Sequence, residues 1–260
     1  MLTVTSTAFH EKLHVGTEEI ILNGPPSDLR GHILLSNNNE ESLRVRALPL
    51  IHDEKIGNTM SDGFQLRLSC RLKPGEEKME SVWHKVHPNT LPGIYESSIM
   101  AGGQKRKVKM VIQSQIDINI YPDFFSFQNT SPGKIHTAIF TLTNLGNIPF
   151  QVPEIKHVAP LDMDLLCRAF GFGFRSKGAE GFTVTMDEIT KNIQANLTDW
   201  SPASVDEIGK IVAPGESLII HLNITLPANS DSRKDYDGNI RFWDKDIAFA
   251  IKSHNENLKK

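Results

Sequence analysis

RLKPGEEKMESVWHKVHPNTLPGIYESSIM, residues 71–100, contains a pattern that occurs a second time further along the chain. In each copy a Pro-Gly-Glu triplet is followed by a proline after 14 or 13 residues and by a tyrosine after 21 or 22 residues. The first copy consists of Pro74-Gly75-Glu76, Pro88 and Tyr95, and the second of Pro214-Gly215-Glu216, Pro227 and Tyr236. The chain of 260 residues therefore contains one structural module twice.

Each part of this pattern has a physical meaning. Proline presets φ for a tight turn and glycine accepts a positive φ, so Pro-Gly predicts a turn. The segment after the second turn alternates regularly, with Leu218, Ile220, Leu222, Ile224 and Leu226 forming one apolar row of a strand. The tyrosines stand where a strand begins after a crossover. This is the position of a tyrosine corner, in which the hydroxyl fixes the incoming loop; the alternative is an ordinary half-buried tyrosine.

Period-two alternation dominates the rest of the chain as well. Gly, Pro and Asn clusters separate the alternating segments at about the 8–12-residue spacing of β-sandwiches, and no helical pattern alternates with them. The predicted strands are residues 9–15, 30–37, 43–50, 64–68, 77–86, 93–100, 107–113, 116–121, 135–144, 217–226 and 238–251. The composition and periodicity predict an all-β fold.

Two runs carry a resemblance to known modules. LKPGEE with HPNTLPGIYESSIMAGGQKRKVKMVI resembles the C-terminal half of bacterial immunoglobulin-like or fibronectin-type β-sandwiches, and IYPDFFSFQNTSPGKIHTAIFTLTNLGNIPFQV resembles the opening half. Together they cover about half of the chain. The resemblance implies two tandem immunoglobulin-like β-sandwiches, and it carries over no catalytic residue because such modules generally have none.

The repeat also predicts the domain boundaries and an insertion. We expect one sandwich in residues 1–113 and another in residues 118–253. Asn37 and Asn144 look like equivalent strand ends, but they precede their Pro-Gly turns by 37 and 70 residues, so the second domain has about 33 extra residues, at about 154–210. Two helices are expected there: a short one capped by Asp162 and ended by Gly171, and another after a capping box at Thr185 to Glu188.

The run Phe170-Gly171-Phe172-Gly173-Phe174, followed by Arg175, is the strongest candidate for function. Long excursions from compact domains are commonly functional, and alternating Phe with Gly offers apolar area on a backbone that a partner can approach closely. The alternative is that the rings only pack the insertion onto its own sandwich. We therefore predict a protein-binding site at Phe170, Phe172, Phe174 and Arg175, in a recognition segment from about Pro160 to Trp200.

Charge and cysteine usage exclude several other classes. The chain has 28 basic and 31 acidic residues, so its formal charge of -3 provides no field for nucleic acid. Cys70 and Cys167 form neither a CxxC motif nor a disulfide framework. No segment approaches a membrane span, and the N-terminus lacks a signal peptide. An extracytoplasmic mature chain is favoured over a cytoplasmic one. Three glycosylation sequons are compatible with secretion, but such tripeptides arise by chance too often to carry this preference.

Histidine motifs suggest metal chemistry only superficially. His10-Glu11-Lys12-Leu13-His14 matches the H-E-x-x-H string of zinc proteases, but that chemistry needs a helix and the segment alternates like a strand. His84 and His87 lie three residues apart, which on a strand places the rings on opposite faces. We predict no catalytic metal, no cofactor and no catalytic residue.

These observations favour a non-enzymatic binding or structural protein, an accessory or subunit of a larger assembly, that recognises protein through the insertion or a sheet edge. Two alternatives stay open. One is a periplasmic chaperone-like protein that acts by strand complementation. The other is a histidine-dependent metal-binding redox or hydrolytic enzyme. The oligomeric state is not predicted.

Overall fold

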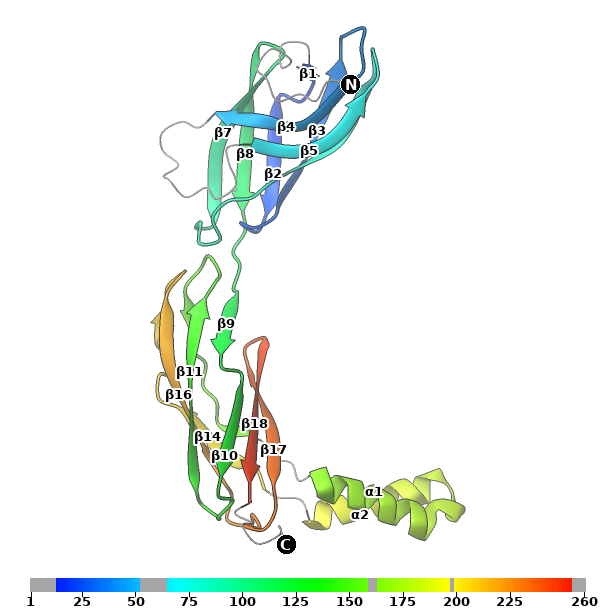
Figure 1. The fold of residues 1–260 in the computed structure, drawn as a ribbon, viewed down its shortest axis with the longest axis vertical. Coiled ribbons are helices and arrows are strands. Elements are labelled where there is room, and N and C mark those ends of the chain that lie inside the picture. The colour runs from blue at the N-terminus through cyan, green and yellow to red at the C-terminus, as the bar shows by residue number, and fades with distance from the viewer. Residues whose placement is uncertain (1–12, 52–64, 159–162, 197–198, 254–260) are drawn as a thin grey trace, which may run out of the picture. The chain divides into compact units, whose positions relative to one another are not determined.

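A computed structural model describes residues 13–51, 65–158, 163–196 and 199–253 (Figure 1). The described chain is mostly β-strand, which confirms the predicted β-rich fold, and two helices interrupt the strands. The chain divides into two compact units. Unit 1 consists of Met1–Asp117, Leu145–Pro149 and Ala213–Gly215, and unit 2 of Ile118–Asn144, Phe150–Val212 and Glu216–Lys260. No helix among the described residues is long and apolar enough to cross a membrane.

The strands of unit 1 alternate between buried and exposed residues. They are β1 (Leu13–Val15), β2 (Glu19–Gly24), β3 (Leu29–Asn37), β4 (Leu43–Ile51), β5 (Gln65–Leu72), β6 (Glu77–His84), β7 (Gly93–Ala101) and β8 (Gln104–Ile112). Strands β7 and β8 form a hairpin around Gly102 and Gly103, which both have positive φ. The predicted strands reappear among the described residues, whereas β2 was not predicted; residues 9–12 of the first predicted strand lie outside the described residues.

Unit 1 closes its sheet into a ring. The strand order is β3-β2-β8-β7-β4-β5-β6, β6 pairs back with β3, and β1 pairs with the end of β3 from Leu35 to Asn37. Strands β2 and β8 are parallel, in six registered pairs from Glu19↔Lys107 to Gly24↔Ile112. The predicted picture of two separate sheets is therefore too simple for this unit, because pairing across both sides makes it barrel-like. Its core consists of alternating residues such as Ile20, Leu22 and Ile33.

The strands of unit 2 form two main sheets. They are β9 (Ile118–Tyr121), β10 (Phe124–Gln128), β11 (Ile135–Asn144), β12 (Phe150–Gln151), β13 (His157–Val158), β14 (Ser201–Val205), β15 (Ile211–Val212), β16 (Ser217–Thr225), β17 (Tyr236–Phe242) and β18 (Lys245–Lys252). One sheet has the order β13-β14-β16-β11-β9 and the other β10-β18-β17, with β10 parallel to β18, while β12 pairs with β15. Phe140 of the first sheet meets Phe242 of the second edge to face, at 5.6 Å between ring centroids.

One strand prediction needs correction in unit 2. Residues 238–251 are not one strand but the hairpin of β17 and β18, which turns at Trp243 and Asp244. Trp243 has a φ of 59°, a left-handed conformation that tight hairpin turns usually assign to glycine. The sequence therefore has no glycine or asparagine at this turn that would have indicated it.

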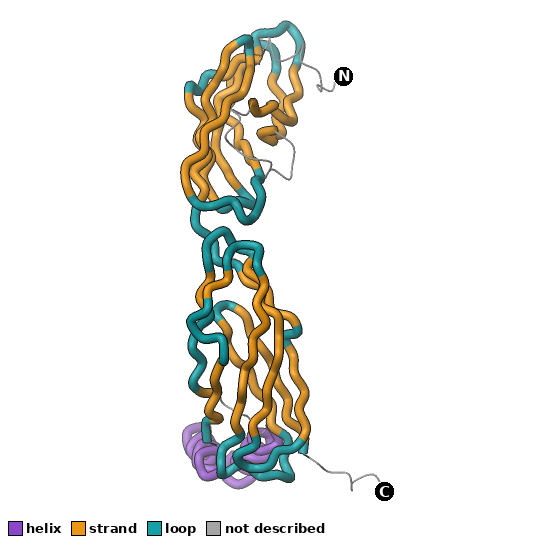
Figure 2. Tube along the Cα trace, turned by 90° about the vertical axis from the view of Figure 1, so that its left-hand side faces the viewer, coloured by secondary structure: helices purple, strands orange, loops and turns teal. Residues whose placement is uncertain are grey.

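The helices occupy the predicted insertion. They are α1 (Met163–Lys177), a 3-10 turn η2 (Gly178–Glu180) and α2 (Phe182–Asn196), and Figure 2 shows them gathered at one end of unit 2. The predicted helix ends are wrong. Helix α1 continues through Gly171, and α2 begins at Phe182, so Thr185 lies inside the helix instead of capping it. Asp162, the expected cap of the first helix, lies outside the described residues.

The tyrosines of the repeat both act as corners. Tyr95 is near the start of β7, and its hydroxyl donates to the carbonyl oxygen of Leu91 at 2.9 Å. Tyr236 is the first residue of β17, is 1% exposed, and accepts the backbone N–H of Asp231 at 2.7 Å. Each hydroxyl therefore holds a loop residue four or five positions before it, as the predicted corner requires.

Candidate functional site

The helical hairpin leaves unit 2 from two neighbouring strands. Strands β13 and β14, before and after it, pair in an antiparallel manner through His157↔Pro202 and Val158↔Ser201. After the hairpin, the backbone N–H of Asp199 donates to the side chain of Asn229 at 3.2 Å. Because the two ends of the excursion are already side by side, the strands of unit 2 do not need the helices to connect them.

The two helices pack on each other through small and branched residues. Leu165, Ala169 and Gly173 of α1 are buried, as are Thr185 and Ile189 of α2. A Cβ atom at Gly173 would lie 2.3 Å from a side-chain carbon of Ile189, so glycine is needed for this close approach. The second glycine of the predicted Phe-Gly run is thus a helix-packing residue.

Polar contacts fix the turn between the helices. The Thr185 hydroxyl lies 2.9 Å from the carbonyl oxygens of both Lys177 and Gly181. Lys177 forms an ion pair with Glu180 at 2.8 Å, and this hydrogen bond raises the pKa of Lys177. Gly181 has a φ of 101°, which permits the chain to reverse before α2. The turn is therefore held by residues at the end of α1 and in the first turns of α2.

Large apolar side chains lie exposed on the hairpin. Phe170 is 41% exposed and Phe174 56% exposed, and both lie one turn apart on α1. Phe182, in the first turn of α2, is 76% exposed. Met163 is also exposed, while Leu166, Met186 and Ile193 are half-buried. The helices thus present more apolar surface than their mutual packing covers.

Helical periodicity assigns these residues to one side of the hairpin. Counted at 100° per residue from the buried contact, one flank of α1 and the corresponding flank of α2 are apolar. In an antiparallel pair of right-handed helices these two flanks lie on the same side. The residues of this apolar face are Met163, Leu166, Phe170 and Phe174 on α1, with Phe182, Met186 and Ile193 on α2.

The structure separates the four predicted binding residues. Phe170 and Phe174 belong to the apolar face, but Phe172 is 200° from each of them around the helix and lies on the other flank. Arg175 is exposed, and its Nε donates back to the carbonyl oxygen of Gly171 at 3.1 Å. The sequence reasoning missed Met163, Leu166, Phe182 and Met186, although the first two precede Phe170 at the helical spacings of seven and four residues.

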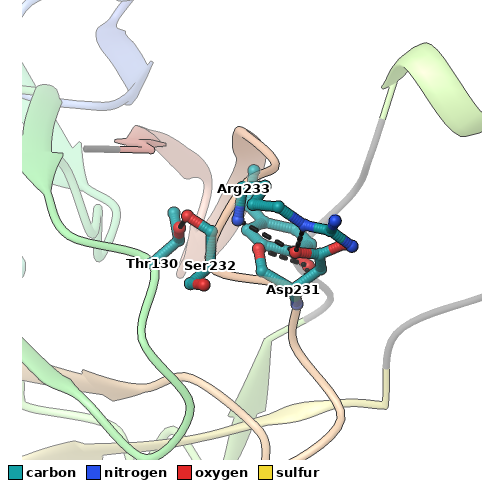
Figure 3. Close-up of polar contacts among 5 residues, drawn as sticks. Thr130, Asp231, Ser232 and Arg233 are labelled. Carbon is teal, nitrogen blue, oxygen red and sulfur yellow. Dashed lines mark hydrogen bonds and ion pairs between the residues drawn. The ribbon is translucent and has the colours of Figure 1, made fainter. Parts of the chain in front are cut away.

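A polar loop lies next to the Asn229 contact. Asp231 accepts the backbone N–H and Nε of Arg233 at 2.9 and 3.1 Å, and Nη2 at 3.1 Å (Figure 3). These hydrogen bonds to Arg233 lower the pKa of Asp231 to about 2. The Thr130 hydroxyl donates to the carbonyl oxygen of Ser232 at 2.7 Å. Several hydrogen bonds therefore hold the loop that precedes Tyr236, in addition to the bond from the Tyr236 corner.

The described histidines of the two metal motifs, His14, His84 and His87, belong to unit 1, whereas the hairpin belongs to unit 2. His10 and Glu11 lie outside the described residues, and His14 lies in strand β1. His84 is buried at the end of β6, with Nδ1 2.9 Å from the carbonyl oxygen of Gln65, and His87 accepts the backbone N–H of Asn89 at 3.3 Å. In the described part of the chain, no three His, Cys, Asp or Glu side chains form a metal-ligand group.

Comparison with known proteins finds similarity only among solved structures. No family model matches the sequence, and no curated protein matches it. Similar structures include the CupB2 chaperone of Pseudomonas aeruginosa, with 9% identity over 91% of this chain and 98% of that chain at a TM-score of 0.24. A titin segment has 10% identity over 92% and 97% at a TM-score of 0.28, and domains 4 and 5 of the S-layer protein SbsC have 10% over 80% and 98% at 0.28. The functional argument therefore rests on the geometry of this chain.

Proposed function

We propose that this protein is a non-enzymatic binding protein made of two tandem immunoglobulin-like domains, and that the apolar face of the unit 2 hairpin recognises a protein partner. The proposal includes an accessory or subunit role in a larger assembly. An extracytoplasmic location is part of the same proposal. The hairpin is the observation that carries it.

The strand order of unit 2 supports the immunoglobulin-like part of the proposal. Such domains have strands A, B, E and D in one sheet and C, F and G in the other. Strands β9, β11, β16 and β14 correspond to A, B, E and D, and β17 and β18 correspond to F and G. Tyr236 then stands at the start of strand F, where the tyrosine corner belongs. The hairpin is an insertion before strand D, between β13 and β14.

The exposed phenylalanines support the binding part. Burying a large aromatic side chain stabilises a protein or a complex by roughly 1.5–3 kcal/mol relative to leaving it in water. Phe170, Phe174 and Phe182 leave much of this contribution unused within the chain. Aromatic side chains on one face, bordered by polar residues, are typical of a surface that another protein covers.

The test compares two surfaces of the same helix. Phe170→Ala with Phe174→Ala removes anchors from the apolar face, while Phe172→Ala removes an equally exposed ring from the other flank. Tagged forms of the full chain are used to isolate partners from the source cells, and the dissociation constant is then measured with the purified partner. We expect the double variant to weaken binding by about 30-fold or more, since an anchor contributes about 2 kcal/mol, and Phe172→Ala to bind as the native chain does.

Thermal unfolding separates binding from folding. If the rings are recognition residues, all variants melt close to the native temperature. A large loss of stability in the double variant with unchanged partner binding would reject the proposal. If Phe172→Ala weakened partner binding as much as the double variant does, the binding site would not be confined to the apolar face. Replacing residues 159–200 by a short glycine-serine turn between the paired ends of β13 and β14 should abolish partner binding and leave the sandwich folded.

A further inference from the structure

Strand β17 is an edge strand of unit 2. In the order β10-β18-β17, strand β18 pairs with one side of β17, and no described strand pairs with the other side. In unit 1 the equivalent strand is β7, which contains the equivalent corner, Tyr95. There β4 pairs with the corresponding edge through Leu50↔Ile99 and Ile51↔Ser98. The same position in unit 2, at Asn239 and Ile240, has no such partner among the described strands.

The hairpin turn determines which backbone groups face this edge. A two-residue turn is closed by a hydrogen-bonded pair, here Phe242↔Lys245, and hydrogen-bonded pairs then alternate with non-bonded pairs along an antiparallel ladder. The non-bonded positions of β17 are Asp237, Asn239 and Arg241. Their N–H and C=O groups point away from β18, toward the free edge.

The side chains of β17 divide in the same alternation. Tyr236, Ile240 and Phe242 are buried in the sandwich. Asp237, Asn239 and Arg241 lie on the outer face, so that one acidic and one basic residue stand symmetrically on either side of the asparagine. Exposed strand edges pair readily with other strands. If two copies of this edge pair in an antiparallel manner, the acidic residue of each copy lies opposite the basic residue of the other.

We propose that this edge pairs with the same edge of a second copy of the chain, antiparallel, about a two-fold axis at Asn239. The outward-facing residues of the two copies then meet in register, with Asn239 opposite Asn239 and each Asp237 opposite Arg241 of the other copy. Two-fold symmetry makes both charge pairs form together. The two three-stranded sheets become one continuous sheet of six strands.

Charges beside the edge extend the complementarity. Arg241 forms an ion pair with Asp246 at 2.7 Å, and Asp237 lies 3.8 Å from the Lys252 ammonium group. In the proposed dimer, negative and positive side chains alternate across the pairing: Asp246 and Arg241 of one copy are followed by Asp237 and Lys252 of the other. Cross-strand pairs of opposite charge stabilise a sheet, and like charges directly opposite destabilise it. This pattern favours a second copy over an arbitrary extended segment.

The experiment measures self-association of the full chain by sedimentation equilibrium. A pairing of two seven-residue strands is small for a protein interface, so concentrations up to about 1 mM are used. Asp237→Arg and Arg241→Asp each place like charges opposite each other twice, and each should weaken the dimer about tenfold or more. The double variant, Asp237→Arg with Arg241→Asp, restores both opposite-charge pairs and should dimerise as the native chain does.

Mixing provides the sharpest readout. The two single variants are complementary to each other, so an equimolar mixture should form heterodimers that neither variant forms alone. Phe170→Ala with Phe174→Ala should leave this self-association unchanged, which separates it from the proposed partner site. A monomeric native chain at all concentrations, equal association of the native chain and the single variants, or failure of the double variant to restore dimers would each overturn the proposal.

Discussion

The backbone N–H of Asn37 donates to the carbonyl oxygen of Glu76 at 3.0 Å, which joins the end of β3 to the Pro-Gly turn. Asn144 makes the same 3.0 Å bond to Glu216 at the end of β11. The side chains repeat the equivalence. The Asn37 amide donates to the carbonyl oxygen of Leu72, two residues before Pro74, and the Asn144 amide to that of Val212, two residues before Pro214. Each unit therefore contains the same pair of asparagine hydrogen bonds, at equivalent positions in its own fold.

Loss of these asparagine hydrogen bonds should destabilise one unit at a time. Both asparagines are fully buried, and Asn37→Ala leaves backbone carbonyl groups without their amide donor. We expect a cost of about 1–3 kcal/mol, in unit 1 for Asn37→Ala and in unit 2 for Asn144→Ala. Denaturant unfolding followed by hydrogen exchange locates the loss. Asn38→Ala, at an exposed neighbour, is the control and should change stability by less than about 0.5 kcal/mol.

The tyrosine corners should differ in strength. Tyr236→Phe removes the acceptor of the Asp231 N–H within a buried environment, and we expect it to cost about 1–2 kcal/mol. Tyr95→Phe removes a bond to Leu91 that is exposed to solvent, so its cost should be smaller. Thermal unfolding of both variants tests this order. A larger loss for Tyr95→Phe would contradict the assignment of burial as the cause.

The two helical glycines of the Phe-Gly run should respond in opposite directions. Gly173→Ala forces a methyl group against Ile189 and should destabilise the hairpin by about 1–3 kcal/mol. Gly171→Ala meets only the Arg175 guanidinium at 3.6 Å, and alanine favours helix by up to about 1 kcal/mol. Limited proteolysis between residues 163 and 196 measures the difference. Faster cleavage of Gly171→Ala than of the native chain would argue against the packing described.

A buried histidine should make the stability of unit 2 depend on pH. His136 packs against Phe127, with 5.1 Å between ring centroids, and burial lowers its pKa below 6.5. The unfolded state therefore binds the proton more readily than the folded state. Stability is complete above about pH 6.5 and decreases as the pH falls below it. His136→Gln should flatten the dependence of the unfolding free energy on pH between pH 7 and 5, which denaturant unfolding at several pH values measures.

Alternation predicted most strands because each has one buried and one exposed face. Strand β11, residues 135–144, matches its predicted range, and its buried residues occupy every second position. The repeated tyrosines could also be interpreted from the sequence, because a tyrosine corner requires a tyrosine at a fixed position near the start of one strand. Prediction failed where tertiary contacts override local preference. Trp243 takes a conformation that usually requires glycine, and Gly171 lies inside a helix that local reasoning ends there.

The candidate site shows the same limit. Alternating Phe and Gly predicted apolar contact area, and Gly171 predicted a helix end, but the whole run lies inside α1, where Gly173 lets α1 approach Ile189 of α2. That contact joins residues sixteen positions apart, and no local pattern contains it. Once the helix is known, the spacing of Met163, Leu166, Phe170 and Phe174 identifies the apolar face, which the interrupted prediction could not.

The parallel pairing of an early strand with the last strand in each unit determines how the units would bear mechanical tension. A force pulling the flanking chain segments apart acts along β2 and β8, and along β10 and β18, in opposite directions. Parallel neighbours under such a load slide past each other, so their evenly spaced hydrogen bonds must rupture together instead of opening one by one. Six registered pairs in unit 1 and five in unit 2 would share the strain. Under such a load we expect each unit to unfold by the joint rupture of these parallel pairs.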